Sequence, residues 1–242
     1  MVKLSSFLNV YEFNTVLKGS GETINYKGLS TNSLKKLLMY TKEEDPLMEE
    51  ELLDKVLEVA IIDENCNIDK MFVLDRYYLL IKIRASTKGD IFEYLYTCPE
   101  CKQEQPKSIN LADLEINKQE KCNPLIELKS LHFILGHPTR EKQKRFFNLI
   151  DKKLSKQEKQ VEILLADLAA YVEEVRTPDG KLLEVDDNEL SDFIGALPED
   201  EVDKFNKWIE DYYFGIIDKI DIKCNKCKYE EKKQLPLKSF FS

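Results

Sequence analysis

Four cysteines, arranged as two Cys-x-x-Cys pairs, are the residues of this sequence whose type and spacing best suit a chemical role. One pair is Cys98 with Cys101, and the other is Cys224 with Cys227. Two residues between cysteines let a tight turn direct both thiolates at one metal ion. Two such turns supply the four ligands of a tetrahedral Zn²⁺ site, with Zn–S distances of about 2.3 Å. The spacing therefore predicts one structural Zn²⁺ per chain, bound by Cys98, Cys101, Cys224 and Cys227.

The segments around the two pairs form an internal repeat. Residues 98–104 (CPECKQE) align with residues 224–230 (CNKCKYE), and the same offset aligns Gln105 with Glu231. In each segment an alternating strand pattern precedes the turn and a polar strand follows it. The repeat predicts two β-hairpins, within residues 90–111 and 217–237, that meet in space and complete one site.

Three other interpretations of these cysteines stay open: a disulfide within each pair, a redox pair of the thioredoxin type, and the remains of a lost site. Disulfides are rare in a reducing compartment. A redox pair of that type usually lies at a helix N-terminus, whereas Lys102 and Lys228 begin polar strand segments. Shared zinc is the favoured interpretation, and four thiolates leave no open position for a substrate. Cys66 and Cys122 are expected to be unpaired thiols.

Signals for an enzyme are weak. The two histidines, His132 and His137, lie at an expected strand end and turn, where packing or solvation is their usual role. The sequence has no His-Glu-x-x-His, phosphate-binding loop or Gly-x-Ser-x-Gly motif, and its eight glycines are scattered. Clustered acids, such as residues 186–187 and 199–201, lie at expected helix starts, where carboxylates stabilise the helix dipole. The sequence thus predicts a protein that is not an enzyme.

Composition places the chain among folded globular proteins. Of its 242 residues, 43% are hydrophobic and 33% are charged, and the formal net charge is −9. A negative chain repels phosphate at long range, which disfavours non-specific nucleic-acid binding. No apolar run approaches the roughly 20 residues of a membrane span, since residues 71–74 are stopped by Asp75 and Arg76, and no signal peptide is evident. We therefore expect a cytoplasmic protein whose partners are neither nucleic acid nor membrane.

The first half of the chain predicts a short β segment followed by helices. A turn at residues 19–21 precedes a strand around residues 24–26 and a first helix. The second helix has Asp45 as its cap and Pro46 at its first position, followed by acids in its first turn. The third helix, from residue 69 to about residue 87, is apolar on nearly every side, which predicts a central buried helix.

The second half predicts two strands and four further helices. The strands lie between residues 125 and 135, and a strong turn occupies residues 177–180. The helix before that turn carries an apolar stripe that includes Val161 and Leu164, and the next helix is capped by Asp187. The expected helices span residues 139–154, 158–176, 187–197 and 198–212.

Charge is unevenly distributed over this second half. Residues 140–159 contain eight basic and three acidic side chains, whereas residues 173–211 contain fourteen acidic and four basic ones. Two interpretations are open: two solvated faces that attract each other, or a partner surface of opposite polarity.

Apolar residues also gather at both ends of the chain. Such residues either fold back on the body or dock on another chain. For residues 239–242 we expect docking, so that their removal leaves the zinc site and thermal stability intact. The residues concerned are Phe7, Leu8, Tyr11, Phe13, Leu235, Leu237, Phe240 and Phe241.

These patterns together predict an α+β fold, with a mainly helical body, an N-terminal β segment and a two-hairpin zinc ribbon that has four cysteine ligands. We expect four segments. They are residues 1–89 (β segment and helices), 90–137 (first zinc hairpin and β region), 138–216 (helical insertion) and 217–242 (second zinc hairpin and tail).

Several of these segments resemble one protein family. Residues 6–13 (SFLNVYEF), 31–38 (TNSLKKLL), 85–90 (ASTKGD) and 96–101 (YTCPEC) are similar to baseplate proteins of T4-like (T-even type) bacteriophages, in particular to baseplate hub subunits or hub assembly proteins. The resemblance covers the first 110 residues and the final Cys-x-x-Cys segment, but not residues 139–216.

This resemblance implies a scaffold or chaperone that acts on hub or tape-measure proteins. The location it implies is the host cytoplasm during tail assembly, and the virion baseplate. It brings no catalytic residues with it. A zinc-ribbon module that binds nucleic acid is the alternative function.

Overall fold

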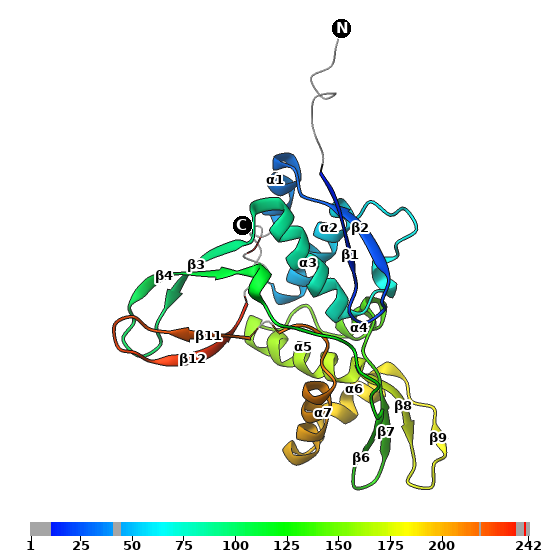
Figure 1. The fold of residues 1–242 in the computed structure, drawn as a ribbon. Coiled ribbons are helices and arrows are strands. Elements are labelled where there is room, and N and C mark those ends of the chain that lie inside the picture. Colours follow the sequence, from blue (N-terminus) through cyan, green and yellow to red (C-terminus); the bar gives the residue numbers. More distant parts are fainter. Residues whose placement is uncertain (1–10, 41–44, 218, 236–239, 241–242) are drawn as a thin grey trace.

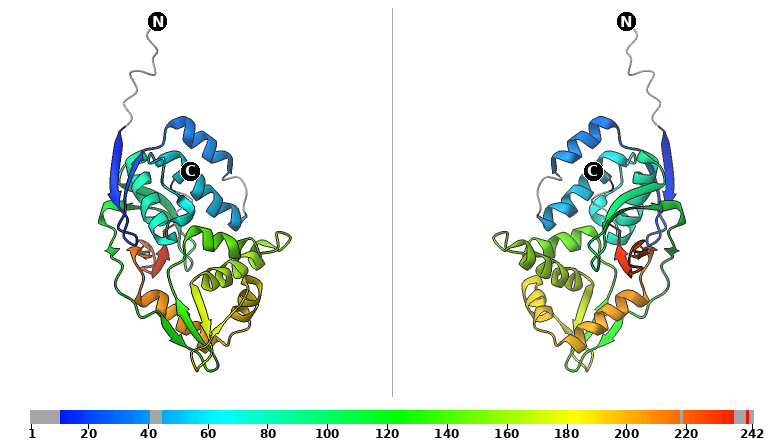
Figure 2. Two further views of the ribbon diagram at one scale, coloured as in Figure 1. Left: turned by 90° about the vertical axis from the view of Figure 1, so that its right-hand side faces the viewer. Right: turned by 90° about the vertical axis from the view of Figure 1, so that its left-hand side faces the viewer.

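Helices and small antiparallel sheets make up the computed structural model, which describes residues 11–40, 45–217, 219–235 and 240. The expected mixture of α and β elements is confirmed, with seven α-helices in the described chain. The elements surround two hydrophobic clusters, one formed mainly by residues 17–111 and the other by residues 126–208. Figure 1 shows the first part above the second, with two hairpins projecting from one side, and Figure 2 shows the same arrangement from two further directions.

The first part packs a β-hairpin and three helices around the first cluster. Three successive backbone amides of the hairpin turn, residues 18–20, donate to the Asp75 carboxylate at 2.8–2.9 Å and fasten the hairpin to α3. Asp45 caps α2 as expected, because its side chain accepts a hydrogen bond from the Leu47 amide. The elements are β1 (Glu12–Val16), β2 (Thr23–Lys27), α1 (Thr31–Tyr40), α2 (Pro46–Ala60) and α3 (Val73–Lys88).

Helix α3 is the central helix, but it begins later than the sequence predicted. A short 3-10 helix (Ile68–Lys70) precedes it, and Phe72 forms an isolated β-bridge with Thr139. The Val73 amide donates to the Pro138 carbonyl, so the backbone before Val73 is engaged by another segment. The expected burial is confirmed at the middle of the helix, where Leu79 and Leu80 are fully buried.

The second part packs helices on a four-stranded antiparallel sheet, in the order β6-β7-β8-β9. The expected strands between residues 125 and 135 and the turn at residues 177–180 are present, and Gly180 in that turn has a φ of 87°. Helix α6 is capped by Asp186, one residue before the expected cap. The elements are β6 (Leu125–Glu127), β7 (His132–Leu135), α4 (Arg140–Phe147), α5 (Lys156–Ala170), β8 (Val172–Arg176), β9 (Leu182–Leu183), α6 (Asp187–Gly195) and α7 (Glu199–Asp211).

Two helices of this part are shorter than predicted. Helix α4 ends at Phe147, because the following residues turn to bury Ile150. Helix α5 ends at Ala170, and residues 172–176 form strand β8 rather than the last helical turn. Val172 and Val175 are buried in β8, which pairs with β7, so sheet pairing prevails over continuation of the helix.

The apolar stripe predicted for α5 is also wrong in part. Val161 and Leu164 are 56% and 65% exposed, and the helix buries Ala166, Ala169 and Ala170 instead. Small side chains let the helix approach its neighbours closely. Among the described helices, none has the length and apolar character that crossing a membrane requires.

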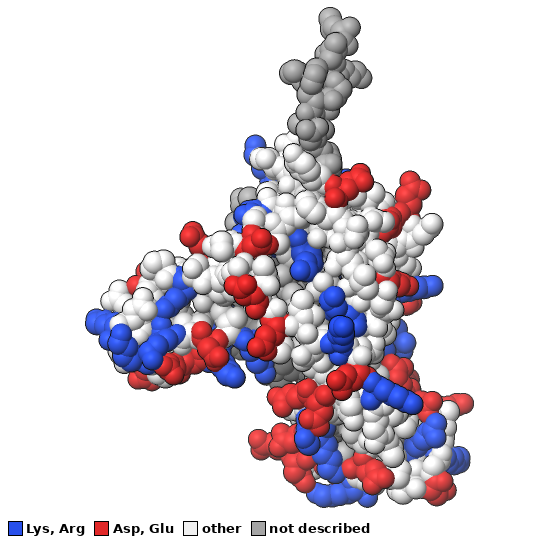
Figure 3. All heavy atoms as spheres, viewed as in Figure 1, with Lys and Arg blue, Asp and Glu red and all other residues white. Residues whose placement is uncertain are grey.

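Basic and acidic segments of the second part attract each other in places. Arg145 of α4 pairs with Asp187 of α6, and Lys142 pairs with Glu173 of β8 at 3.0 Å. Figure 3 shows both charge types intermixed over this part of the surface. These two pairs agree with the interpretation of mutually attracting faces.

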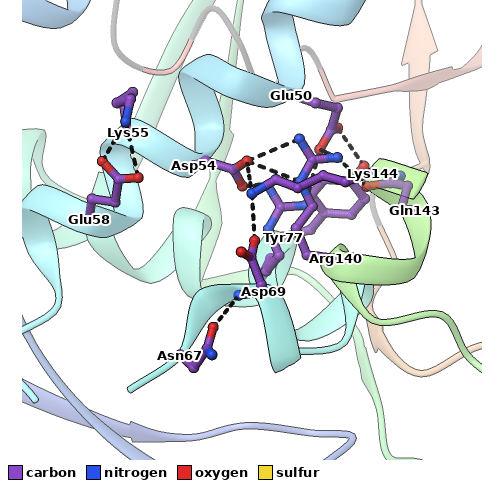
Figure 4. A network of polar contacts seen from close by, with 11 residues as sticks. Glu50, Asp54, Lys55, Glu58, Asn67, Asp69, Tyr77, Arg140, Gln143 and Lys144 are labelled. Atoms are coloured by element: carbon purple, nitrogen blue, oxygen red, sulfur yellow. Dashed lines mark hydrogen bonds and ion pairs between the residues drawn. The ribbon is translucent and has the colours of Figure 1, made fainter. Parts of the chain in front are cut away.

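A buried network of charges joins the two parts of the molecule (Figure 4). Arg76 of α3 and Arg140 of α4 both donate to Asp54 of α2, and Arg76 also pairs with Glu50 at 3.0 Å. Arg76 is fully buried and Arg140 is 2% exposed. Because α2 and α3 belong to the first cluster and α4 borders the second, this network holds the two clusters together.

The end of the chain returns to the first part. Strand β10 (Gly215–Ile216) pairs with β5 (Ile116–Asn117), and Leu235 and Phe240 are buried in the first cluster. Phe240 therefore folds back on the body, and the prediction that it docks on a partner is wrong. Tyr11, in contrast, is 72% exposed. Four other terminal residues lie outside the described part of the chain: Phe7, Leu8, Leu237 and Phe241.

Candidate metal centre

Two hairpins of the same design carry the four cysteines. One joins β3 (Ile91–Thr97) to β4 (Glu104–Asn110), and the other joins β11 (Lys219–Lys223) to β12 (Glu230–Gln234). In the first turn the Lys102 amide donates to the Cys98 carbonyl at 3.0 Å, and in the second the Lys228 amide donates to the Cys224 carbonyl at 3.1 Å. The repeat in the sequence is thus a repeat of backbone geometry, as predicted.

Both turns contain a residue in the left-handed backbone region. Lys102 has a φ of 56° and Lys228 a φ of 65°, and among the described non-glycine residues only these two have a positive φ. This conformation costs an L-residue about 1 kcal/mol or more relative to glycine. The positive φ at aligned positions shows that the two turns have the same backbone conformation.

The four Sγ atoms converge at one point between the hairpins. All lie within 4.8 Å of one another, and they belong to Cys98, Cys101, Cys224 and Cys227. Across the hairpins, Cys98 Sγ lies 3.6 Å from Cys227 Sγ, and Cys101 Sγ lies 3.7 Å from Cys224 Sγ. A tetrahedron of sulfurs around Zn²⁺, with Zn–S near 2.3 Å, has edges of about 3.8 Å. The donor set therefore fits a tetrahedral metal ion, and all six cysteines of the chain are free thiols.

A small apolar cluster encloses the sulfurs. Cys98 and Cys224 are fully buried and pack with Tyr96 and Ile222, whereas Cys227 lies at the surface. Burial of two ligands on the inner side excludes water from that side of the centre. A metal ion held here would have all four positions occupied by sulfur.

Backbone amides of the turns favour thiolates at the inner positions. The Cys227 amide is the main cause that lowers the pKa of Cys224 to about 5, against the effect of burial and with help from the Gln105 side chain. Burial raises the pKa of Cys98, but the amides of Cys101 and Glu100 lower it, and the lowering prevails. Thiolates are the protonation state that binds a metal ion.

Gln105 is a residue of the centre that sequence reasoning did not single out. It is 6% exposed, its Nε2 donates to Cys224 Sγ at 3.2 Å, and its Oε1 accepts from the Asn225 amide at 2.9 Å. Its aligned counterpart Glu231 accepts a hydrogen bond from the Tyr96 hydroxyl at 2.8 Å. Each β-strand that leaves a turn thus sends one side chain across to the other hairpin. The alignment of Gln105 with Glu231 was the available signal.

The remaining candidate residues lie away from this centre. Cys66 is half-buried, and burial raises its pKa above the ordinary thiol value; Cys122 is half-buried in the second cluster. His137 is buried among Phe214, Trp208 and other aromatic rings. Within the described residues, the four cysteines form the only group of His, Cys, Asp or Glu side chains arranged to hold a metal ion.

Comparison with known proteins adds one match. A family model described as T4 bacteriophage base plate protein matches residues 9–242, which includes residues 139–216 that the sequence resemblance did not cover. No curated protein and no solved structure matches the chain.

Proposed function

Because the chain belongs to the family of T4 bacteriophage base plate proteins, we propose that it is a hub subunit or hub assembly factor of the tail base plate, a scaffold or chaperone held together by one structural Zn²⁺. The zinc ligands in this proposal are Cys98, Cys101, Cys224 and Cys227. The observation that carries the metal part is the convergence of the four sulfurs. Membership of the family implies that the chain interacts with other base plate components, and hub and tape-measure proteins are the partners that we propose.

A closed centre suits a scaffold rather than a catalyst. Four sulfur ligands leave no position for water or substrate, so the ion would fix the two hairpins relative to each other. One hairpin directly follows the central helix α3, and the other comes after α7. An ion bound by both would close the long loop between Cys101 and Cys224, and closing such a loop costs conformational entropy. We propose on this ground that the protein is not an enzyme and acts through its surfaces.

Metal analysis of the reduced full-length protein tests the zinc part. We expect one equivalent of zinc in the native chain, in Cys66→Ser and in Cys122→Ser, which remove thiols outside the cluster. Cys98→Ser and Cys227→Ser should each lose tight binding, because each removes one of four ligands whose apparent binding free energy in zinc peptides is about 10–16 kcal/mol. A native chain that contains no zinc while its hairpins resist hydrogen exchange would overturn this part.

The hub part requires the phage system. Co-expression with hub and tape-measure proteins should give a complex that co-purifies with this chain. Mass spectrometry that compares purified virions with infected-cell lysate should show whether the chain is in the finished base plate or only in assembly intermediates. Co-purification with base plate wedge proteins but with no hub component would contradict the hub assignment.

A nucleic-acid-binding role is the alternative that one observation favours. Lys102, Lys226 and Lys228 are exposed at the outer end of the hairpins, where Figure 3 shows a group of basic side chains. These lysines also lie where they would offset the net negative charge of four thiolates around Zn²⁺, which accounts for them within the scaffold proposal. Filter binding over a range of salt concentrations separates the two, since phosphate binding weakens steeply with salt.

A further inference from the structure

An open groove of about 960 Å³ lies in the second part of the molecule, away from the cysteines. Helix α4 forms one wall, and the segment from β9 to the start of α6 forms the other. Phe146, Val175 and Leu190 are buried side chains that line it, and Leu182 lines it while 55% exposed. The groove thus has a floor that is apolar in part.

The rim of this groove is strongly acidic. Seven carboxylates line it, against two cationic side chains, Lys142 and Arg145. Both cations are already paired with lining carboxylates, Glu173 and Asp187. The carboxylates are those of Glu141, Glu173, Glu174, Glu184, Asp186, Asp187 and Glu189.

Four of these carboxylates are not neutralised by a salt bridge. Within the described residues the bridges involve only Glu173, Glu174 and Asp187, so none is formed by Glu141, Glu184, Asp186 or Glu189. Seven like charges around one groove repel each other, and a partner that brings positive charge relieves this repulsion. The surplus charge therefore selects a cationic occupant.

Two polar features of the groove also lack partners among the described residues. Strand β9 ends the four-stranded sheet, so one edge of its backbone is unpaired. His137 lines the groove, is 7% exposed, and has no hydrogen-bond partner for Nδ1. Burial lowers the pKa of His137, which favours the neutral ring, and a buried ring nitrogen without a partner is a polar atom that a hydrogen bond would stabilise.

We propose that this groove, defined by α4, β8, β9 and the start of α6, is the docking site for a basic segment of another base plate protein. In that segment Lys or Arg would alternate with apolar residues, since an extended chain beside β9 presents successive side chains to opposite faces. The identity of the partner as a base plate protein rests on the proposed function, whereas the chemistry of the segment rests on the groove alone.

A second copy of this chain is a less suitable occupant. Its exposed lysines include Lys102, Lys226 and Lys228 at the hairpin tips. A contact between the tip of one copy and the groove of the next is head-to-tail, and such contacts grow into rings or open filaments. We therefore commit to a different protein.

A designed peptide tests the groove directly. The probe is a ten-residue peptide of alternating Lys and Val, added to the full-length chain while methyl signals are followed by NMR. We expect shifts at Leu182 and Val185, and an affinity that falls about tenfold when salt is raised from 50 to 300 mM. A Glu–Val peptide of the same length should not bind.

Matched variants locate the binding. Glu184→Lys with Glu189→Lys should raise the Kd about tenfold or more, because each reversal turns an attraction into a repulsion. Glu12→Lys with Glu93→Lys changes the net charge equally on exposed strands outside the groove and should leave the Kd within about twofold. Melting curves of both pairs confirm that each variant is folded.

Three results would overturn the proposal. The first is that methyl signals of the groove do not shift at millimolar peptide, and the second is that the Glu–Val peptide binds equally well. The third is that the chain forms an oligomer in solution that the groove variant abolishes, because the occupant would then be a second copy. The zinc content of the same samples is measured separately. If a native chain without zinc binds the peptide, the zinc part of the proposed function is refuted while the groove proposal stands.

Discussion

Replacement of Asp54 by Asn should weaken the joint between the two hydrophobic clusters more than any surface substitution on the same helix. Asp54 is 5% exposed and accepts hydrogen bonds from Arg76 and Arg140, and Lys144 Nζ lies 3.3 Å from it. The two guanidinium groups are almost completely buried. Without the carboxylate charge, they keep only Glu50 as an acidic partner within the described network.

The size of the effect follows from this burial. Removal of one partner from a buried ion pair costs about 3–5 kcal/mol, because a desolvated charge is left uncompensated. We expect the lower end, about 3 kcal/mol, since Glu50 stays 3.0 Å from Arg76 and Asn keeps one acceptor oxygen. For a chain of this length the entropy of unfolding near the midpoint is about 0.5 kcal/mol/K, so Tm should fall by about 6 °C.

Helix α2 supplies its own control for this substitution. Glu58 forms an ion pair with Lys55 one turn further on, with side chains 50% and 47% exposed. Such a pair contributes at most about 0.5 kcal/mol, so Glu58→Gln should change Tm by about 1 °C.

Urea unfolding, followed by circular dichroism and by the fluorescence of Trp208 in the second cluster, measures both variants. A loss below about 1 kcal/mol for Asp54→Asn would refute the reasoning, because the network would then be dispensable. Burial raises the pKa of Asp54, but the charge of Arg76 lowers it and the lowering prevails. The contribution of Asp54 is therefore complete above about pH 4 and is lost as pH falls through its folded pKa, a loss that Asp54→Asn should abolish.

Three further outcomes are expected. Lys102→Gly should stabilise the protein by about 0.5–1 kcal/mol, because glycine adopts a positive φ without strain. Lys226→Gly removes an equal charge at a turn position without a positive φ and should not stabilise the protein. Equal melting curves for the two variants would contradict this. Phe240→Ala should lower stability by about 3 kcal/mol in urea unfolding, since the ring is 1% exposed and its centroid lies 4.6 Å from that of Phe92; an unchanged midpoint would return this residue to a docking role. Burial raises the pKa of Asp167 to about 7, so the native state binds the proton more tightly and stability should fall as pH rises from about 4 to 7. Asp167→Asn should remove that fall, and a pH profile identical to that of the native chain would show that this carboxyl is not the source.

The sequence was informative wherever a feature depends on neighbouring residues. Asp45 and Pro46 start α2 because a cap and a fixed φ act within one turn. The Cys-x-x-Cys spacing and the alternating strands before it define each hairpin locally, and the repeat indicated that the two hairpins are alike. The convergence of their sulfurs could be expected from the chemistry of a four-coordinate ion, although the residues lie far apart in the chain.

Features that depend on distant partners were decided by the tertiary structure. Residues 172–176 continue a helical pattern, yet β7 offers a ladder in which Val172 and Val175 are buried, so they form a strand. The sequence contained no sign that Asp54 of α2 would meet Arg76 and Arg140 inside the protein. Phe240 is buried because its ring packs against that of Phe92, a contact that no local pattern encodes. Local rules fix turns, caps and periodicity, whereas burial of a charge or an aromatic ring is a property of the surface that it meets.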